Sequence, residues 1–287
     1  MKQLYPLERA VEYIEAHLHE PITLRDVSRE TGYSYYHMTR LFSAALGEPV
    51  GRYIHRRRLY AASQQLVRTG RRIIDIALES GFASPEAFSR AFKAAFGSSP
   101  AEYRKAGVDR VVGAKRPLEP ADVRHIAWGV SHTPEILTLG ETRLAGLRGT
   151  TSLSDNRLPA LWERFLRLRG ALSVAQGPGY GVCETQQTAY TPEGDVAFSV
   201  LVGGQVEDLD GLPPPLVGKT LRAGRYAVFT HRGSFAKLFQ SYQYIFGTWL
   251  PASGAELDER EDFERYNRAV TSFGGPDNEV EIFIPIK

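Results

Sequence analysis

Residues 73–104 read IIDIALESGFASPEAFSRAFKAAFGSSPAEYR, and this stretch decides the fold of the first half of the chain. Apolar residues recur in it at helical spacing, and Gly81 separates the two apolar runs. Glycine accepts the positive φ of a tight turn, and proline suits the first turn of a helix, as at Pro85. The stretch therefore predicts two helices separated by a turn, which is a helix-turn-helix unit.

The same pattern occurs once more, about 50 residues earlier. Gly32-Tyr33 precedes Gly81-Phe82 by 49 residues, and one inserted residue makes the later offset 50, as between Arg40 and Arg90. The matched residues are Leu24, Val27, Met38, Phe42, Ala45, Gly47 and Tyr53 in the first copy and Ile73, Ile76, Phe88, Phe92, Ala95, Gly97 and Tyr103 in the second. Such a repeat predicts two helix-turn-helix units, joined by a long helix from about Pro49 to Val67.

The second helix of each unit carries polar residues suited to reading DNA. Tyr36, Thr39 and Arg40 follow i, i+3, i+4 spacing, so they share a face away from the apolar residues. In the other unit the polar positions are Ser84, Glu86, Ser89 and Arg90. Arginine binds a guanine edge with two hydrogen bonds, and glutamate accepts one from a cytosine amine. Two such helices would reach successive major grooves, about 34 Å apart.

Charge is divided unevenly along the chain. Residues 1–117 hold 19 Lys+Arg and 12 Asp+Glu, a net charge of +7, whereas residues 118–287 hold 16 and 21, a net charge of −5. A basic half indicates a polyanionic partner. We expect phosphate contacts from Arg52, Arg56 and Arg57, with Arg58, Arg71 and Arg72 as further candidates. Residues 56–58 are consecutive and point in different directions, so at least one should cover the core instead.

The first half resembles the AraC/XylS-type transcription regulators. The residues on that family's motif positions are Ile76, Ala77, Gly81, Phe82, Ser84, Phe88, Phe92, Lys93, Gly97, Ser99, Pro100, Tyr103 and Arg104. The resemblance covers about residues 5–107 and implies that Arg40 and Arg90 face the bases. Tyr36 stands where relatives often carry tryptophan, and Pro85-Glu86 where some carry glutamine, so we do not expect their target sequence to carry over. The expected DNA-binding residues are Ser34, Tyr36, Thr39, Arg40, Ser84, Glu86, Arg90, Arg52, Arg56 and Arg57.

The rest of the chain changes its pattern. Residues 108–134 mix charges, proline and glycine and indicate a linker between an all-α domain at 1–107 and a second domain at 135–287. Strands are expected within 135–148, 180–185, 196–206, 216–231, 263–266 and 280–286. Helices should follow Asp155 or Asn156 and Ser234, the second one closed by Pro251. This order is β-α-β-β twice, which predicts an α+β domain with an internal two-fold.

Several phrases of this second domain resemble the GyrI-like small-molecule-binding domain. They begin at Ala223, Trp249, Phe263 and Glu281. Together with the first half, they resemble the right-origin-binding subgroup of regulators. The resemblance implies a cleft for a hydrophobic, often cationic effector, with Glu264 as its carboxylate. We expect Tyr266, Trp162, Tyr180 and Trp249 to line it, because aromatic rings and a carboxylate suit a delocalised cation. From the residues alone, a surface ion pair between Glu264 and Arg265 is the favoured interpretation, and only the resemblance favours a pocket carboxylate. Both tryptophans can be core residues.

Composition narrows the remaining classes. A single cysteine, Cys183, excludes an intramolecular disulfide and a multi-cysteine zinc site, so no metal or cofactor is expected. No signal peptide is apparent, and no window of 18 apolar residues predicts a membrane span. We therefore expect a cytoplasmic bacterial activator that is not an enzyme. It should bind double-stranded DNA as a monomer and contact RNA polymerase. Two alternatives make the second domain a hydrolase with Glu264 as general base, or a protein-interaction module.

Overall fold

The structure is a computed structural model, and it describes residues 5–107, 115–152, 157–172, 177–190, 196–267 and 272–287. They form two compact units. The first unit contains Met1–Val130 together with Lys237–Gly254, and the second contains Ser131–Ala236 and Ala255–Lys287. The segment Lys237–Gly254 was expected in the C-terminal domain. It packs with the helices of the first unit, while both of its ends continue into the second.

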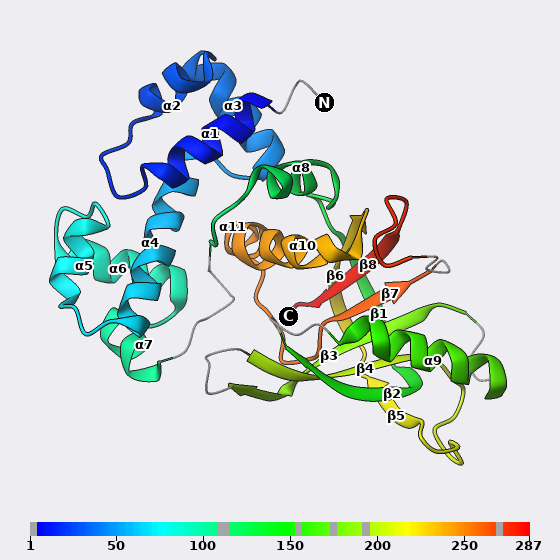
Figure 1. The fold of residues 1–287 in the computed structure, drawn as a ribbon. Coiled ribbons are helices and arrows are strands. Elements are labelled where there is room, and N and C mark those ends of the chain that lie inside the picture. Colours follow the sequence, from blue (N-terminus) through cyan, green and yellow to red (C-terminus); the bar gives the residue numbers. More distant parts are fainter. Residues whose placement is uncertain (1–4, 108–114, 153–156, 173–176, 191–195, 268–271) are drawn as a thin grey trace. The chain divides into compact units, whose positions relative to one another are not determined.

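The first unit is helical (Figure 1). Its helices before the second unit are α1 (Tyr5–Ala16), α2 (Leu24–Thr31), α3 (Tyr35–Leu46), α4 (Val50–Arg68), α5 (Ile73–Glu79), α6 (Pro85–Phe96), α7 (Pro100–Ala106) and α8 (Pro120–Trp128). The predicted helix-turn-helix units are α2–α3 and α5–α6, and α4 joins them. Gly32 and Gly81 have φ values of 71° and 78° in the two turns, as the repeat requires.

Local sequence explains the second unit of this pair. The Ser84 side chain accepts a hydrogen bond of 3.1 Å from the backbone N–H of Ala87, which caps α6. Phe88, Phe92 and Phe96 follow at helical spacing and are buried in one aromatic core. The Tyr103 ring of α7 meets Phe92 edge to face, with 5.2 Å between the centroids. This core fixes α6 against α4 and α7.

Part of the expected linker is helical. Helix α8 lies within residues 108–134 and packs on α1, α3 and α10. Its start carries ordinary signals, since Pro120 lies in the first turn and Glu119 and Asp122 form a reciprocal capping box. The linker interpretation missed them because the surrounding residues are rich in charge, proline and glycine.

The segment Lys237–Gly254 is almost continuously helical. It contains α10 (Leu238–Tyr244), the π-helical turn η2 (Ile245–Trp249) and α11 (Leu250–Ser253). Pro251 was expected to end this helix, and that expectation was wrong. The proline lies just after the junction of η2 and α11, and the chain stays helical to Ser253.

The second unit is built on one eight-stranded antiparallel sheet (Figure 1). Its elements are β1 (Glu135–Leu139), β2 (Thr142–Ser152), α9 (Leu158–Leu172), β3 (Gly179–Tyr190), β4 (Val196–Gln205), β5 (Val217–Leu221), β6 (Gly224–Arg232), the 3₁₀ turn η1 (Phe235–Lys237), β7 (Phe263–Tyr266) and β8 (Glu279–Pro285). The strand order is β1-β6-β8-β7-β3-β4-β2-β5. The two repeats are therefore arranged symmetrically about the β7–β3 pair. Each repeat also gives its preceding strand to the other, because β1 pairs with β6 and β5 with β2.

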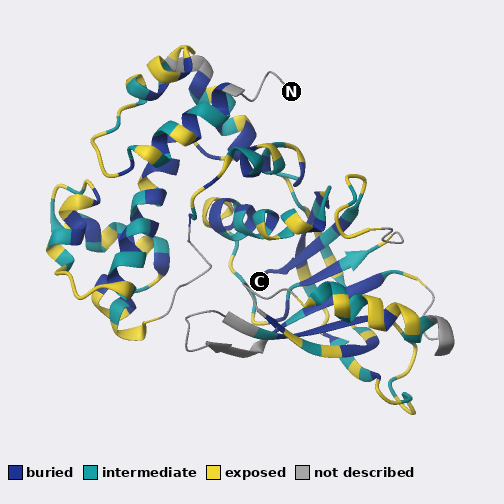
Figure 2. Ribbon diagram, in the orientation of Figure 1, coloured by how far each residue is buried: buried dark blue, intermediate teal, exposed yellow. Residues whose placement is uncertain are grey.

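The two faces of the sheet bury different residues. One face holds an apolar cluster that includes Tyr180, Val182, Phe263 and Phe283. On the other face α9 packs through Phe165 and its neighbours, and the outer side of α9 is exposed (Figure 2). Because successive strand residues alternate between faces, Glu264 and Tyr266 lie on the face opposite Phe263. The helix start expected at Asp155 or Asn156 lies outside the described residues.

Candidate functional site

The two reading helices present matched polar residues to solvent. In α6, Glu86 and Arg90 are exposed while Phe88 and Phe92 are buried. A hydrogen bond to its own backbone N–H, another with Ser84 and the charge of Arg90 hold the Glu86 pKa below its usual range. Glu86 is therefore a carboxylate at neutral pH, which can accept from a cytosine amine and repels phosphate.

Helix α3 repeats this arrangement. Ser34 and Arg40 are exposed, Thr39 is half-buried, and Met38 is buried on the opposite side. Tyr36 lies in the first turn of α3, but its side chain lies outside the described residues. The structure therefore places Arg40 of α3 and Glu86 and Arg90 of α6 on the solvent side of their helices. Their contacts with DNA stay predictions.

The arginines of α4 differ sharply from one another. Arg52 is exposed, whereas Arg56 is half-buried with its guanidinium 3.5 Å from the buried Glu48 carboxylate. Arg57 is buried, and its guanidinium donates to both carboxylate oxygens of Glu15, at 2.7 and 2.6 Å. The expected phosphate contact of Arg57 was therefore wrong, because this side chain points into the unit.

The further candidates for phosphate contact, Arg58, Arg71 and Arg72, form hydrogen bonds or ion pairs within the chain. Arg58 donates to the carbonyl oxygens of Leu18 and Glu20, at 3.0 and 2.5 Å, so it fixes the chain that enters α2. Arg71 pairs with Glu79, and Arg72 with Asp75, on the exposed side of α5. These pairs neutralise part of the charge that the composition assigns to the DNA-facing half.

A second candidate site lies at the two-fold of the sheet. Glu264 of β7 is 4% exposed, and the Tyr266 hydroxyl donates to its Oε2 at 2.7 Å. The Trp162 ring of α9 meets the Tyr266 ring, with 4.9 Å between the centroids. The structure thus brings together a buried carboxylate and two aromatic rings, three of the five residues that the sequence proposed for ligand binding.

Two glycines of β3 make room for this group. A Cβ on Gly181 would lie 2.9 Å from Glu264 Oε2, and one on Gly179 would lie 2.9 Å from the Trp162 ring. The carboxylate and the indole therefore rest directly on strand backbone. Sequence reasoning missed both glycines, although alternate glycines within a strand signal a close approach of another group.

The acidic hydrogens in this site stay bound at neutral pH. Burial, and then the charge of Glu264, raise the pKa of the Tyr266 hydroxyl well above its usual value. Burial and the neighbouring Asp262 and Glu264 likewise raise the pKa of the Cys183 thiol. Neither group is therefore activated as a nucleophile.

The remaining two expected ligand residues lie elsewhere. Tyr180 belongs to the opposite face of β3 and packs in the apolar cluster with Phe263, so the structure separates it from Glu264. Trp249 ends η2 in the first unit, while Glu264 belongs to the second. In the part of the chain that the structure describes, no group of three His, Cys, Asp or Glu residues could hold a metal ion, and no helix is long and apolar enough to cross a membrane.

Comparison with known proteins matches both halves of the chain. Residues 27–106 match a helix-turn-helix domain, and residues 132–287 match the GyrI-like small molecule binding domain. The right origin-binding protein of Escherichia coli (strain K12) is 30% identical over 96% of this chain and 96% of its own length. The chain belongs to the GyrI-like family. This chain joins the GyrI-like domain to an AraC-type helix-turn-helix domain.

Further relatives match the DNA-binding half of this chain. The HTH-type transcriptional activator AarP of Providencia stuartii is 40% identical over 32% of this chain and 68% of its own length. A crystal structure of an AraC-type transcriptional regulator from Chromobacterium violaceum is 33% identical, covers 36% of this chain and 91% of its own, and has a TM-score of 0.35. The chain is a DNA-binding transcription regulator with a small-molecule-binding domain.

Proposed function

We propose that this regulator binds one asymmetric DNA site as a monomer, with α3 and α6 in successive major grooves. The observation that carries this proposal is the matched exposure of Arg40 and Arg90 on two units joined by a single helix. Helix α4 has 19 residues and is about 28 Å long at 1.5 Å per residue, which is close to one turn of B-DNA. On this basis the chain activates transcription in the cytoplasm through a contact with RNA polymerase, as a regulator rather than an enzyme.

The same proposal assigns a hydrophobic cation to the second unit. Glu264 supplies a buried negative charge, and Trp162 and Tyr266 supply rings that stack on a flat or aromatic cation. In the structure, the Tyr266 hydroxyl and the Trp162 ring occupy the surroundings of the carboxylate. A bound cation would replace the Tyr266 hydroxyl, which now donates to Glu264 at 2.7 Å, as the partner of the carboxylate.

The DNA-binding part is tested on a site selected from a random DNA pool by the full chain. Arg40→Ala and Arg90→Ala should each cost about 1–3 kcal/mol of binding free energy and relax the base choice at one separate position. Arg29→Ala is the matched control, because it removes an exposed arginine from α2 rather than from a reading helix. Equal affinity of the wild type for all DNA sequences would contradict the proposal.

The ligand-binding part is tested with two ions of one shape and opposite charge. Tetraphenylphosphonium should bind in calorimetry and tetraphenylborate should not, because only the cation compensates the buried carboxylate. Glu264→Gln should weaken tetraphenylphosphonium binding by about tenfold or more, which is 1.4 kcal/mol. The control is Glu281→Gln, which alters a carboxylate paired with Arg265 at 2.8 Å instead. Equal binding of both ions, or hydrolysis of an ester panel that Glu264→Gln abolishes, would overturn the sensing role.

A further inference from the structure

The turn between α3 and α4 is held by the segment Lys237–Gly254. Gly47, the first residue of this turn, has a φ of 71°. A Cβ on Gly47 would lie 2.9 Å from the Tyr244 ring, so the ring packs directly on the backbone where the first reading helix ends. Glu48 follows and is 1% exposed.

Lys115 connects this turn to the same segment. Its ammonium lies 2.6 Å from Glu48 Oε1 and donates at 2.9 Å to the Thr248 hydroxyl of η2. Its backbone carbonyl accepts a 3.0 Å hydrogen bond from Arg57 of α4. The ammonium also lies over the Tyr53 ring, 5.1 Å from its centroid. Lys115 is 4% exposed, so all of these contacts are made inside the first unit.

Stability alone does not account for these buried charges. A buried ion pair is often replaceable by apolar residues of similar volume without loss of stability, and its best attested use is to fix one arrangement of packed elements. Here the fixed elements are the end of α3, the start of α4 and the π-helical turn η2. Such π-helical turns are frequent at functional sites.

The internal repeat supplies a comparison within the chain. In the second helix-turn-helix unit, the turn that matches Gly47-Glu48 is Gly97-Ser98. Gly97 also has a positive φ, but a serine replaces the acid. Helix α6 packs on α4, α5 and α7. Glu48, its partner Lys115 and the contact of Lys115 with η2 therefore belong to the turn after the first reading helix. The matching turn after the second reading helix has no acid at this position.

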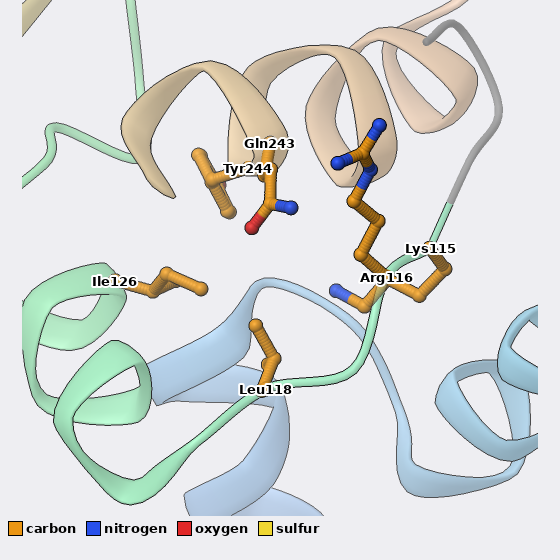
Figure 3. Close-up of a pocket in the computed structure, with 6 residues that line it drawn as sticks. All are labelled: Lys115, Arg116, Leu118, Ile126, Gln243 and Tyr244. Atoms are coloured by element: carbon orange, nitrogen blue, oxygen red, sulfur yellow. The ribbon is translucent and has the colours of Figure 1, made fainter. Parts of the chain in front are cut away.

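A small pocket lies beside these contacts (Figure 3). Lys115, Arg116 and Leu118 line it from the chain before α8, Ile126 lines it from α8, and Gln243 and Tyr244 line it from α10. It has room for about one water molecule, which is far too little for a drug-sized ligand. The pocket is therefore not a ligand site, although Lys115 and Tyr244 of the contacts above both line it.

We propose that Lys115 and Thr248 are positioning residues for the first reading helix. The segment that carries Thr248 lies within the GyrI-like match, and both of its ends continue into the sheet unit. A change in that unit therefore reaches α3 through Thr248, Lys115 and Glu48, whereas α6 is held by its own core. This inference rests on the proposed DNA binding by α3 and α6.

The experiment measures which half of the DNA site responds. The full chain is tested on the selected site and on two derivatives, one scrambled where Arg40→Ala changes base choice and one scrambled where Arg90→Ala does. Thr248→Val removes the hydroxyl at nearly constant volume, Thr248→Ser restores it, and Lys115→Met removes the ammonium. Ser98→Ala is the matched control, in the turn that follows α6 of the second helix-turn-helix unit. Thermal unfolding of each variant reports stability separately.

We expect Thr248→Val and Lys115→Met to weaken binding to the intact site by about fivefold or more, the lower end of typical coupling between sites. On the derivative that lacks the α3 half, both variants should bind as the wild type does. Thr248→Ser should restore affinity, and Ser98→Ala should leave the α3 half unaffected. Equal losses on both derivatives, or no loss anywhere, would overturn the inference. If neither Arg40→Ala nor Arg90→Ala affects binding, the proposed function has failed instead.

Discussion

Two arginines of α4, five residues apart in the sequence, have opposite surroundings. Arg52 is exposed, whereas Arg57 is buried and donates to both oxygens of Glu15. Removing one partner of a buried ion pair leaves a buried charge and costs about 3–5 kcal/mol. We therefore expect Arg57→Met to lower the free energy of unfolding by about 3 kcal/mol, as measured by urea titration.

Arg52→Met is the control for this change. It should leave the urea midpoint in place and reduce the slope of log affinity against log salt by about one, because one phosphate contact is lost. An Arg57→Met protein as stable as the wild type would show that the Glu15 pair contributes nothing. Equal losses of stability in Arg52→Met and Arg57→Met would contradict the special role of the buried pair.

At this scale the sequence indicates equivalent positions of the two reading helices, but it does not indicate which arginine of α4 is buried. The offset of 50 residues singles out Arg40 and Arg90, because a repeat places equivalent residues on equivalent faces. The run Arg56-Arg57-Arg58 carries no signal that tells which side chain is buried, since that depends on Glu15, which lies 42 residues away from Arg57. The partners of Glu48 and Lys115 are hidden for the same reason.

A titratable side chain, His125, lies where helix α8 contacts α10. His125 Nε2 lies 2.8 Å from the Ser241 hydroxyl, and burial, followed by the charge of Lys237, lowers the His125 pKa to about 4. The folded chain thus binds this proton less tightly than the unfolded chain, whose histidine titrates near 6.5. The stability contributed by neutral His125 is complete above pH 6.5 and is lost as the pH falls toward 4.

Urea unfolding at pH 7 and pH 5 checks this expectation. The wild type should lose about 1 kcal/mol more between these pH values than His125→Gln, after allowance for the partly exposed ring. His19→Gln is the matched control, because it replaces an exposed histidine outside the contact between α8 and α10. Parallel pH profiles for the wild type and His125→Gln would mean that this histidine does not titrate differently in the folded state.

Continuous apolar spacing predicts a helix well, whereas strand pairing depends on distant contacts and is not predicted. The helix predicted from Pro49 to Val67 spans Val50–Arg68, because its apolar spacing is continuous. The 216–231 stretch yields two strands that do not pair with each other, since β5 pairs with β2 and β6 with β1 and β8. This pairing of β5 and β6 with strands of the other repeat depends on the two-fold arrangement of the whole sheet. No local sequence pattern encodes it.

The net charge of the whole chain conceals two modules with different partners. The positive part of the sequence builds the two reading units, while the negative part contains the buried Glu264 carboxylate. Bulk charge decides neither site, since Arg57, Arg71 and Arg72 are all paired with acids. What the charge division predicts is an affinity for DNA that falls with salt, because phosphate contacts release counterions.

The spacing of the two reading helices gives the final prediction. Because one helix, α4, joins the two helix-turn-helix units, a single chain fixes the distance between the two major grooves that α3 and α6 would enter. Inserting five base pairs between the two halves of the selected site turns one groove to the opposite side of the DNA. Affinity should then fall to that of a site with one half scrambled, and inserting ten base pairs should not restore it. Native mass spectrometry of the intact complex should find one chain per duplex. Recovery of affinity with the ten-base-pair insertion, together with two chains per duplex, would indicate a dimer in which each chain reads one half.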